Sequence, residues 1–316
     1  MKNIFFLFVF LLSLSCANEF DKYKERPKYI TEASASDKAY FEAYDKTLQL
    51  WDVSCEELYI PTTDGIAHVI VSGPKSGEPL VLLHGMNASS TMWYPNIQSL
   101  SENHRVYAID FLLEPGKSYL YKDMESIDKV IDWYKEVLFV LKLDSYHVIG
   151  ASRGGWLSVK LALENQHEIK SLVLLSPAQT FSWIRPSEGL LKNIVSLLSS
   201  KEKRIEQSLK TMSSNVDNIS DAYLEQYYIG TEKDSVNKFL INMKPFPNDV
   251  LKTLQMPVLV LIGDDDIINT EKTIEIVKTL PKGKGEIIKN AGHFLSIDQA
   301  EEVNKKMLDF LNNLPD

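Results

Sequence analysis

Cysteine is scarce in this sequence, since its 316 residues include only Cys16 and Cys55. So few thiols exclude a disulfide framework as the source of stability, and Cys55 has no partner if Cys16 is removed or modified. Clusters of Cys and His with the spacing of metal ligands are also lacking. We therefore expect no metal and no cofactor, and we expect Cys55 to be chemically passive.

Positive charge is in deficit as well. The chain has 34 Lys and Arg against 43 Asp and Glu, which gives a formal net charge of −9 at pH 7. A nucleic-acid-binding surface needs a basic patch, and no run of Lys or Arg interleaved with aromatic residues is present. The composition therefore excludes nucleic acid as a partner. With 44% hydrophobic and 24% charged residues, the chain is instead expected to fold around a large core.

Long apolar runs are lacking, and a short one stands at the N-terminus. Residues 4–14 are almost entirely apolar and follow Met1-Lys2-Asn3. A membrane-spanning helix needs about 20 apolar residues, so this run is too short to be one. A cationic start followed by an apolar run of this length predicts a signal peptide over residues 1–16. We therefore expect the protein to be exported to the cell envelope.

Cys16 follows Leu14-Ser15 at the end of this apolar run. The arrangement resembles a bacterial lipobox, although such motifs usually have Leu three places before the Cys, where this chain has Ser13. The resemblance implies that Cys16 carries a lipid and anchors the protein to the surface of a bacterial membrane. Ordinary signal cleavage near Ala17 and an uncleaved anchor are the alternatives.

The rest of the chain alternates short apolar runs with amphipathic helical patterns. Continuous apolar runs are typical of strands in a parallel sheet that is covered on both faces. These runs are residues 80–83, 106–109, 147–149, 172–175 and 258–262. The helical patterns are residues 127–143, 154–164, 271–279 and 300–311. The alternation predicts an α/β fold with a mostly parallel, doubly wound sheet, formed by residues 56–176 and 253–316.

Two segments do not follow this alternation. Residues 17–55 are predicted to form a polar tether and a lead-in helix, the helix at about Asp37–Leu48. Residues 177–252 contain helical patterns and no strand of the parallel kind, so an all-helical insertion is expected there. Its helical patterns are residues 190–198, 203–212, 222–229 and 236–241.

The sequence Gly150-Ala151-Ser152-Arg153-Gly154 follows the strand that ends at Ile149 and begins a helix. A G-x-S-x-G motif in this strand-to-helix context is typical of a nucleophilic serine. The tight turn holds the Ser152 hydroxyl out at the carboxyl end of the sheet, and the N-terminus of the following helix favours negative charge there. Ser152 is therefore the candidate nucleophile, and an ordinary strand-to-helix turn is the alternative.

A nucleophilic serine needs a base, because its hydroxyl alone is too weakly acidic. In the order serine, acid, histidine, the base follows the nucleophile, and only His167 and His293 follow Ser152. His167 ends a helix that leads away from the site. His293 lies in a loop after the strand at 286–288, at the sheet edge where ligand-facing residues collect. We therefore predict that His293 is the base.

Three successive carboxylates, Asp264 to Asp266, follow the strand at 258–262, and one of them is expected to orient the imidazole of His293. With this third element, residues 56–314 resemble the α/β-hydrolase family. The family's pattern after this strand is Gly, two variable residues and then the acid. This pattern falls on Asp266, and Asp265 is the alternative.

The same resemblance implies an oxyanion hole made of two backbone N–H groups. One belongs to Arg153, and the other belongs to Met86 in the segment that begins with His84. His84 is implied to hold this loop through hydrogen bonds. The nearby Asn87 and Trp93 are candidate substrate-binding residues, and core packing is an equal alternative for Trp93.

Two positions depart from the family's pattern. Relatives often show Asp-x-x-Gly-x-Gly-x-Ser after the strand at 106–109, and this chain has a rebuilt loop from Asp110 to Ser118. Relatives also commonly carry an apolar residue or Gln where this chain has Arg153. Its cation can bind a carboxylate of the substrate or pair with Glu114 or another acid, and we favour the pair.

These residues predict a serine hydrolase that cleaves a small carboxylic ester through Ser152, His293 and Asp266 and an acyl-enzyme. The resemblance implies that the helical insertion is a cap over the site. One alternative is a carbon–carbon bond hydrolase of the meta-cleavage type, whose acidic substrates Arg153 would suit. An alternative from another class is a non-catalytic binding protein anchored in the envelope.

Overall fold

The computed structural model describes residues 20–184, 200–231 and 243–314. The described strands are β1 (Cys55–Pro61), β2 (Gly65–Ser72), β3 (Glu78–Leu83), β4 (His104–Ile109), β5 (Tyr119–Leu120), β6 (Tyr146–Ala151), β7 (Ile169–Leu175), β8 (Val258–Gly263) and β9 (Gly283–Ile288). The described α-helices are α1 (Lys28–Thr31), α2 (Ala35–Leu48), α3 (Ile97–Leu100), α4 (Ile127–Val140), α5 (Arg153–Glu164), α7 (Lys201–Met212), α8 (Asp221–Gly230), α10 (Asn248–Leu251), α11 (Glu271–Val277), α12 (Leu295–Asp298) and α13 (Ala300–Asn312). The described 3₁₀-helices are η1 (Asp21–Tyr23), η2 (Ser90–Trp93) and η3 (Val216–Asn218).

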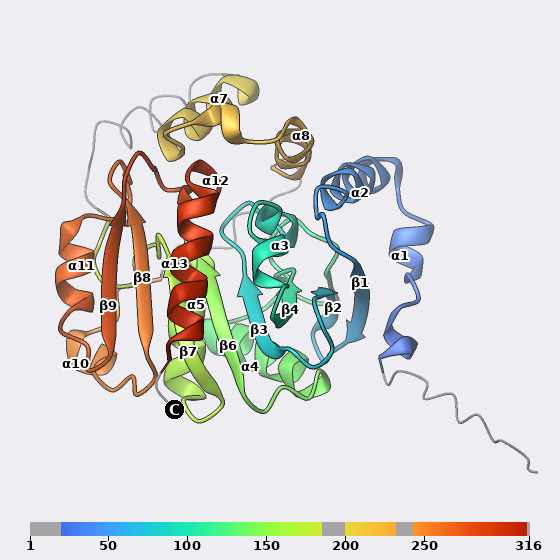
Figure 1. Cartoon of the computed structure of the whole chain (residues 1–316). Helices are drawn as coiled ribbons and strands as arrows, with labels where there is room; N and C mark the ends of the chain where they lie inside the picture. Colours follow the sequence, from blue (N-terminus) through green and yellow to red (C-terminus); the bar gives the residue numbers. More distant parts are fainter. Residues whose placement is uncertain (1–19, 185–199, 232–242, 315–316) are drawn as a thin grey trace, which may run out of the picture.

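Within the described residues, nine strands form one sheet with helices on both faces (Figure 1). The strand order is β1-β2-β4-β3-β6-β7-β8-β9, and β5 pairs with β2. Along the part of this order that runs β4-β3-β6-β7-β8-β9, each pair of neighbouring strands is parallel. By contrast, β2 pairs antiparallel with β1, β4 and β5. The predicted α/β fold with a mostly parallel sheet is therefore confirmed.

The central strands contribute to two hydrophobic cores, one on each face of the sheet. Successive side chains of a strand point to opposite faces. In β3, Leu80 and Leu82 therefore join the core that contains α3 and α13, whereas Val81 and Leu83 join the core that contains α4 and α5. Both faces are covered, which is why these strands are continuous apolar runs in the sequence.

The helix predicted for residues 127–143 is α4, and it ends earlier, at Val140. Lys142 adopts a φ of 58°, the left-handed conformation that commonly terminates a helix. The N–H of Leu143 then donates to the carbonyl of Leu138 at 3.1 Å. Helical periodicity continues past the real end because Leu143 is buried in the same core.

The segment before β1 is more ordered than the tether predicted for it. From residue 20 onward the chain forms η1, α1 and α2, beside β1 at one edge of the sheet (Figure 1). The Arg26 guanidinium donates to Glu57 of β1 at 2.9 Å, and the Tyr29 hydroxyl donates to the carbonyl of Lys117 at 2.7 Å. These polar contacts, together with the buried Tyr40 and Tyr44 of α2, dock the segment on the body of the protein.

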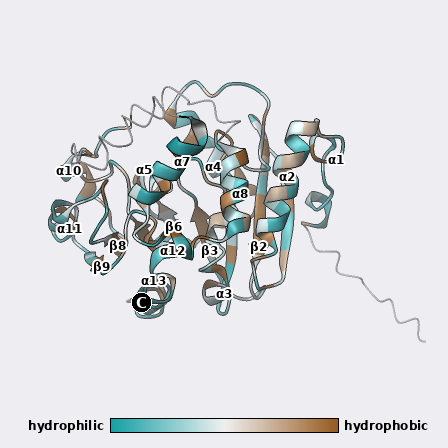
Figure 2. Ribbon diagram, turned by 90° about the horizontal axis from the view of Figure 1, so that it is seen from above, coloured by the Kyte–Doolittle hydropathy of each residue, from teal (hydrophilic) through white to brown (hydrophobic). Residues whose placement is uncertain are grey.

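The helices α7 and α8 lie above the carboxyl ends of the central strands (Figures 1 and 2). They correspond to two of the helices predicted for the insertion. The other two, at 190–198 and 236–241, lie outside the described residues. The Thr47 hydroxyl of α2 donates to the carbonyl of Ala222 in α8 at 2.9 Å. The N-terminal helix therefore supports the helical insertion over the strand ends.

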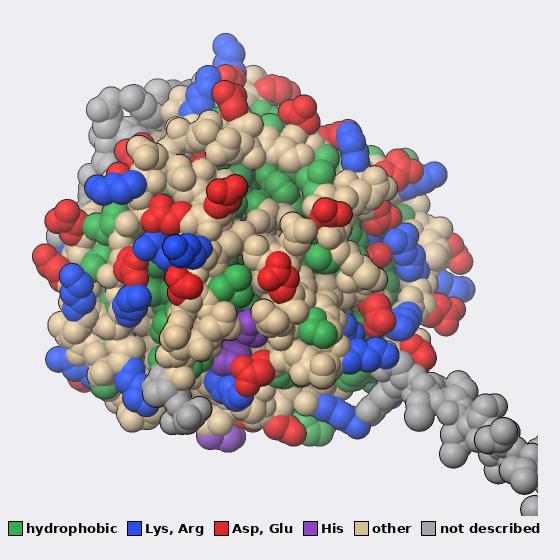
Figure 3. Space-filling model, viewed as in Figure 1, with side chains coloured by type: hydrophobic (Ala, Val, Ile, Leu, Met, Phe, Trp, Pro, Cys, Tyr) green, Lys and Arg blue, Asp and Glu red, His purple; other side chains and the backbone are tan. Residues whose placement is uncertain are grey.

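The predicted signal peptide at 1–16, including Cys16, lies outside the described residues. Among the helices that the structure describes, none combines the length and the apolar character needed to cross a bilayer. On the face seen in Figure 3, Lys and Arg side chains are interspersed with Asp and Glu side chains.

Candidate active site

Ser152 lies in the turn between β6 and α5. Its backbone has φ 50° and ψ −114°, a conformation that costs a residue other than glycine about 1–3 kcal/mol. Two hydrogen bonds hold it there. The Ser152 N–H donates to the carbonyl of Leu175 at 2.9 Å, and its own carbonyl accepts from the N–H of Ala178 at 3.1 Å. The end of β7 and the residues after it therefore fix the strained turn that presents the hydroxyl.

The two glycines of the motif are required by close backbone packing. A Cβ at Gly150 would lie 2.3 Å from the hydroxyl oxygen of Ser158. A Cβ at Gly154 would lie 2.2 Å from the carbonyl oxygen of Leu83. Neither position accepts a larger residue, so the G-x-S-x-G pattern in this chain reflects the close packing of α5 against β6 at Gly150 and against β3 at Gly154.

His293 and Asp266 lie beside Ser152, the candidate nucleophile. The Nε2 atom of His293 is 2.9 Å from Ser152 Oγ, and its Nδ1 atom is 3.0 Å from Asp266 Oδ1. In the neutral imidazole, Nδ1–H donates to the carboxylate and leaves Nε2 to accept the serine proton. Both partners are buried, with side-chain exposures of 5% for His293 and 0% for Asp266. The three side chains form one hydrogen-bonded chain from carboxylate to hydroxyl.

Asp266 is held by three donors. Besides His293, it accepts from the N–H of Ile268 at 2.8 Å and from the side-chain amide of Asn269 at 3.0 Å. Burial alone would raise the pKa of Asp266, but the adjacent His293 and these donors more than offset it, so the pKa lies below its usual value. The other two carboxylates point elsewhere. Asp264 accepts from the N–H of Ala291, and Asp265 contacts the Ser214 hydroxyl.

The loop that carries His293 is bound to the helical insertion. The N–H of Phe294 donates to the carbonyl of Met212, the last residue of α7, at 2.9 Å. Asp298 accepts from the N–H of Gly292 at 2.8 Å and from the N–H of Ser214 at 3.0 Å. Asp298 could not be predicted from the sequence, because no motif marks a carboxylate that bridges two distant loops.

The loop after β3 passes close to Ser152, the candidate nucleophile. A Cβ at Gly85 would lie 3.4 Å from the Cβ of Ser152, which places the following residue, Met86, at the site. His84 fixes this loop: its Nε2 accepts from the N–H of Phe111 at 2.9 Å, and its Nδ1–H donates to the carbonyl of Gly85 at 2.9 Å. Burial lowers the pKa of His84, which suits this neutral hydrogen-bonding role.

A cavity of about 100 Å³ opens beside Ser152 and His293. Met86 and Asn87 line it, as do two faces of the insertion. The lining residues from the insertion are Ser208 and Met212 of α7 and Tyr223 and Tyr227 of α8. These four residues were not predicted from the sequence, although the spacing of four residues within each pair places both members on one helix face.

Trp93 does not line this cavity, which corrects one of the two predictions of substrate-binding residues. Its side chain is fully buried in the core beside α2 and α3, and the preceding residue, Met92, lines the cavity instead. The two residues belong to η2, where neighbouring side chains point in different directions. The core-packing alternative for Trp93 is therefore the correct one.

Arg153 pairs with Glu114, one of the two roles considered for its cation. The guanidinium forms an ion pair with the Glu114 carboxylate, and the side chains are 11% and 1% exposed. Glu114 comes from the rebuilt loop after β4. The two departures from the family's pattern, the rebuilt loop and Arg153, are therefore linked by one buried ion pair.

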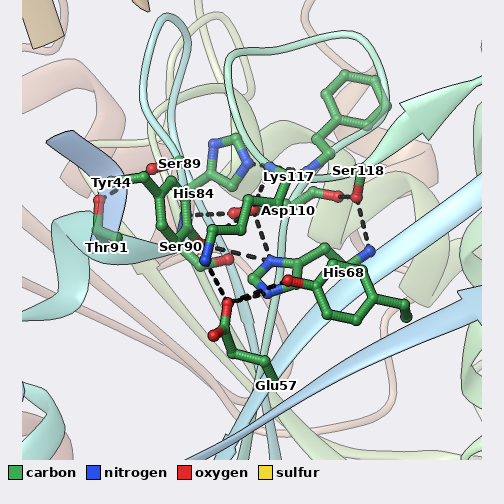
Figure 4. Close-up of polar contacts among 12 residues, drawn as sticks. Tyr44, Glu57, His68, His84, Ser89, Ser90, Thr91, Asp110, Lys117 and Ser118 are labelled. Atoms are coloured by element: carbon green, nitrogen blue, oxygen red, sulfur yellow. Dashed lines mark hydrogen bonds and ion pairs between the residues drawn. The ribbon is translucent and has the colours of Figure 1, made fainter. Parts of the chain in front are cut away.

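A second group of buried titratable residues surrounds His68 (Figure 4). The Nδ1 atom of His68 is 2.9 Å from Asp110, and its Nε2 atom is 3.0 Å from Glu57. Lys117 forms ion pairs with Glu57 and with Asp45 of α2. These charges bind the N-terminal segment to β1, β2 and the rebuilt loop.

The pKa values of this group follow from its contacts. Burial alone would lower the pKa of His68, but its hydrogen bonds to Asp110 and Glu57 raise it. Burial alone would raise the pKa of Asp110 and of Glu57, but His68 holds both well below their usual values. Among the residues that the structure describes, no group of three His, Cys, Asp or Glu side chains has the arrangement of a metal site.

The family model described as alpha/beta hydrolase fold matches residues 78–200. The chain is 32% identical over 290 residues to an uncharacterized carboxylesterase, nap, of Bacillus subtilis, with 90% of this chain and 95% of the relative covered. It is 33% identical to the carboxylesterase YbfK of the same organism, with 86% and 93% covered. The crystal structure of naproxen esterase (carboxylesterase NP) from Bacillus subtilis superposes with a TM-score of 0.80 at 32% identity, and covers 88% of this chain and 99% of that one.

Proposed function

Because this chain belongs to the α/β-hydrolase family and is a hydrolase, we propose that it cleaves small carboxylic esters with Ser152 as nucleophile. In this proposal His293 is the general base and Asp266 orients it. The observation that carries the proposal is the continuous contact from Asp266 through His293 to Ser152, at 3.0 and 2.9 Å, on the wall of a cavity.

In the proposed mechanism, Ser152 Oγ attacks the ester carbonyl carbon while its proton passes to Nε2 of His293. The backbone N–H groups of Met86 and Arg153 stabilise the oxyanion that forms, and the N-terminus of α5 adds to this field. Asp266 stabilises the imidazolium, which then protonates the departing alcohol. Water, deprotonated by His293, attacks the acyl-enzyme and releases the acid and free Ser152.

The cavity supports a small substrate. Its volume of about 100 Å³ is below the range of about 300–1,000 Å³ that is usual for pockets that hold drug-sized ligands. Apolar side chains of Met86, Met92 and Leu175 line it beside the serine, which suits an aliphatic acyl group. The two curated relatives are carboxylesterases by name, and this supports an ester as the bond that is cleaved.

The alternatives considered for the sequence have less support. The meta-cleavage alternative drew on Arg153 as a site for an acidic substrate, and Arg153 is already paired with the buried Glu114. The binding-protein alternative does not apply to a hydrolase. Ester hydrolysis is therefore the function we propose.

A second part of the proposal is export and lipid anchoring through Cys16, which the pattern of residues 1–16 supports. Residues 17–20 separate Cys16 from η1, so a lipid on Cys16 would hold the folded body within about 18 Å of the bilayer. Incorporation of radiolabelled palmitate into wild type and Cys16→Ala tests this. Equal incorporation into both would show that the anchor is wrong.

Labelling with a fluorophosphonate probe tests the nucleophile. The wild type and the surface variant Ser36→Ala are expected to label equally, and Ser152→Ala is expected not to label. Hydrolysis of p-nitrophenyl acetate, butyrate and octanoate then measures acyl-chain preference, which we expect to fall with length. A folded wild type that neither labels nor hydrolyses any of the three esters would refute the proposed function.

A further inference from the structure

The rebuilt loop after β4 carries a buried carboxylate that the proposed mechanism does not use. The side chain of Glu114 is 1% exposed. One carboxylate oxygen, Oε2, accepts from the backbone N–H of Asn87 at 2.8 Å. The other, Oε1, forms the ion pair with the Arg153 guanidinium. One buried carboxylate therefore contacts two segments that are far apart in the sequence.

Both contacts lie next to the proposed oxyanion donors. Asn87 directly follows Met86, and Arg153 is itself the residue after Ser152. The two N–H groups of the hole belong to separate loops, one after β3 and one after β6, and no covalent connection fixes the distance between them. Glu114 touches the first loop through a main-chain amide and the second through a charged side chain.

The backbone makes an unusual turn at Asn87, and the hydrogen bond from the Asn87 N–H to Glu114 lies at this turn. Asn87 adopts a φ of 57°, a left-handed conformation that is uncommon outside glycine and is tolerated by asparagine. This conformation turns the chain directly after Met86. The hydrogen bond from the Asn87 N–H to Glu114 holds the turn, and a shift of the turn would move the Met86 N–H with it.

We propose that Glu114 is a positioning residue that holds the Met86 and Arg153 N–H groups at the spacing an oxyanion needs. The inference rests on the proposed function of Ser152. Oxyanion donors act through preorganisation, and removal of one donor lowers kcat by about 10²–10³-fold. The ion pair with Arg153 compensates the charge of Glu114, which would otherwise be buried without a counter-ion.

The variant Glu114→Gln tests the inference. The amide keeps an acceptor for the Asn87 N–H but cannot pair with the guanidinium. We expect kcat to fall about 10–100-fold, a part of the loss for a missing donor, while KM stays within about twofold. The affinity for a boronic acid inhibitor, whose tetrahedral adduct carries the oxyanion charge, should fall by the same factor as kcat.

Two further variants separate positioning from a general loss of structure. Glu114→Gln/Arg153→Gln replaces the charged pair by a neutral one, and we expect it to recover part of the lost kcat. Glu136→Gln is the matched control, because Glu136 also accepts a backbone N–H, that of Thr63 at 2.9 Å, but lies away from the site. It should retain the wild-type kcat. Rates are expressed per active site, counted from the end point of fluorophosphonate labelling.

The outcomes are distinguishable. If folded Glu114→Gln keeps kcat and boronate affinity within about twofold of wild type, the positioning role is refuted while the esterase proposal stands. A raised KM with unchanged kcat would assign the pair to substrate binding and would also refute it. If wild type itself hydrolyses no ester, the proposed function fails first.

Discussion

Two buried pairs of aspartate and histidine in this protein have the same geometry at one ring nitrogen and differ at the other. Nδ1 lies 3.0 Å from the carboxylate in His293–Asp266 and 2.9 Å in His68–Asp110. Nε2 of His293 faces the hydroxyl of Ser152, whereas Nε2 of His68 faces the carboxylate of Glu57. The second neighbour is what separates the proposed active site from a structural ion pair.

The physical reason is the proton on Nε2. An imidazole between two carboxylates donates from both nitrogens, so it is held as the imidazolium and has no lone pair to accept a proton. In agreement with this, the hydrogen bonds to Asp110 and Glu57 raise the pKa of His68. An imidazole between a carboxylate and a hydroxyl keeps its lone pair and can act as a base. His293 also borders a cavity, and His68 is closed off beneath α2.

The largest effect should come from removal of the base. We expect His293→Ala to lower the kcat of ester hydrolysis by about 10⁶-fold, because Ser152 loses its proton acceptor. His68→Gln should keep kcat per active site within about threefold, since it lies outside the proton path. Steady-state rates on p-nitrophenyl butyrate measure both. If His68→Gln lost activity to the same degree, the distinction between the two pairs would be wrong.

Removal of the orienting charge should have a smaller effect on activity. We expect Asp266→Asn to lower kcat by about 10⁴-fold, because the amide can favour the wrong tautomer of His293 and no longer stabilises the imidazolium. The matched variant Asp110→Asn should lower the free energy of unfolding and leave kcat unchanged. Rates per active site and urea unfolding on both variants give the comparison. A stability loss without a rate loss in Asp266→Asn would contradict the role of Asp266.

The structural pair should show its effect in the free energy of unfolding. His68→Gln leaves Glu57 and Asp110 in the same buried region without the charge between them. Removal of one partner from a buried ion pair costs about 3–5 kcal/mol, and we expect a loss in this range. Urea denaturation gives the value. A loss below about 1 kcal/mol, the range of exposed pairs, would mean that solvent screens this group.

The smallest effect is the dependence of this stabilisation on pH. The raised pKa of His68 means that its contribution is complete below its ordinary value of 6.5 and is lost as pH rises through the folded-state pKa. The lowered pKa of Glu57 means that its contribution is complete above its ordinary value of 4.5 and is lost as pH falls through the folded-state pKa. The stability difference between wild type and His68→Gln should therefore be largest between pH 4.5 and 6.5. Urea midpoints of both proteins across pH 4.5 to 9 test this, and a difference that grows above pH 6.5 would contradict it.

Local patterns allowed the sheet to be predicted from the sequence, and they mark the candidate nucleophile. The strands are apolar runs because they are buried on both faces, and Ser152 stands in a motif whose glycines are needed for packing. His293 followed from chain order. The choice of Asp266 among three carboxylates needed the family resemblance, because all three follow the same strand.

The contacts that the sequence did not predict are polar and long-range. Glu57, His68 and Asp110 come from three separate elements, β1, β2 and the loop after β4, and no periodicity marks them as neighbours. The same holds for the charged and hydroxyl contacts of the N-terminal segment, such as those of Arg26 and Tyr29, which add to the apolar packing of α2. For Trp93 the cavity wall and the core were equal alternatives, because the orientation of a 3₁₀-helix decides whether Trp93 or the neighbouring Met92 reaches the cavity.

The bond between Phe294 and Met212 has a practical consequence for enzyme engineering. Exchange of the insertion between related enzymes is a direct way to change specificity, and the predicted borders at 177 and 252 are the obvious places to cut. Such a chimera would replace the end of α7 that holds the loop of His293, so it would alter the base together with the pocket. A graft that keeps residues 212–214 from this chain preserves the contacts of Met212 and Ser214 with that loop.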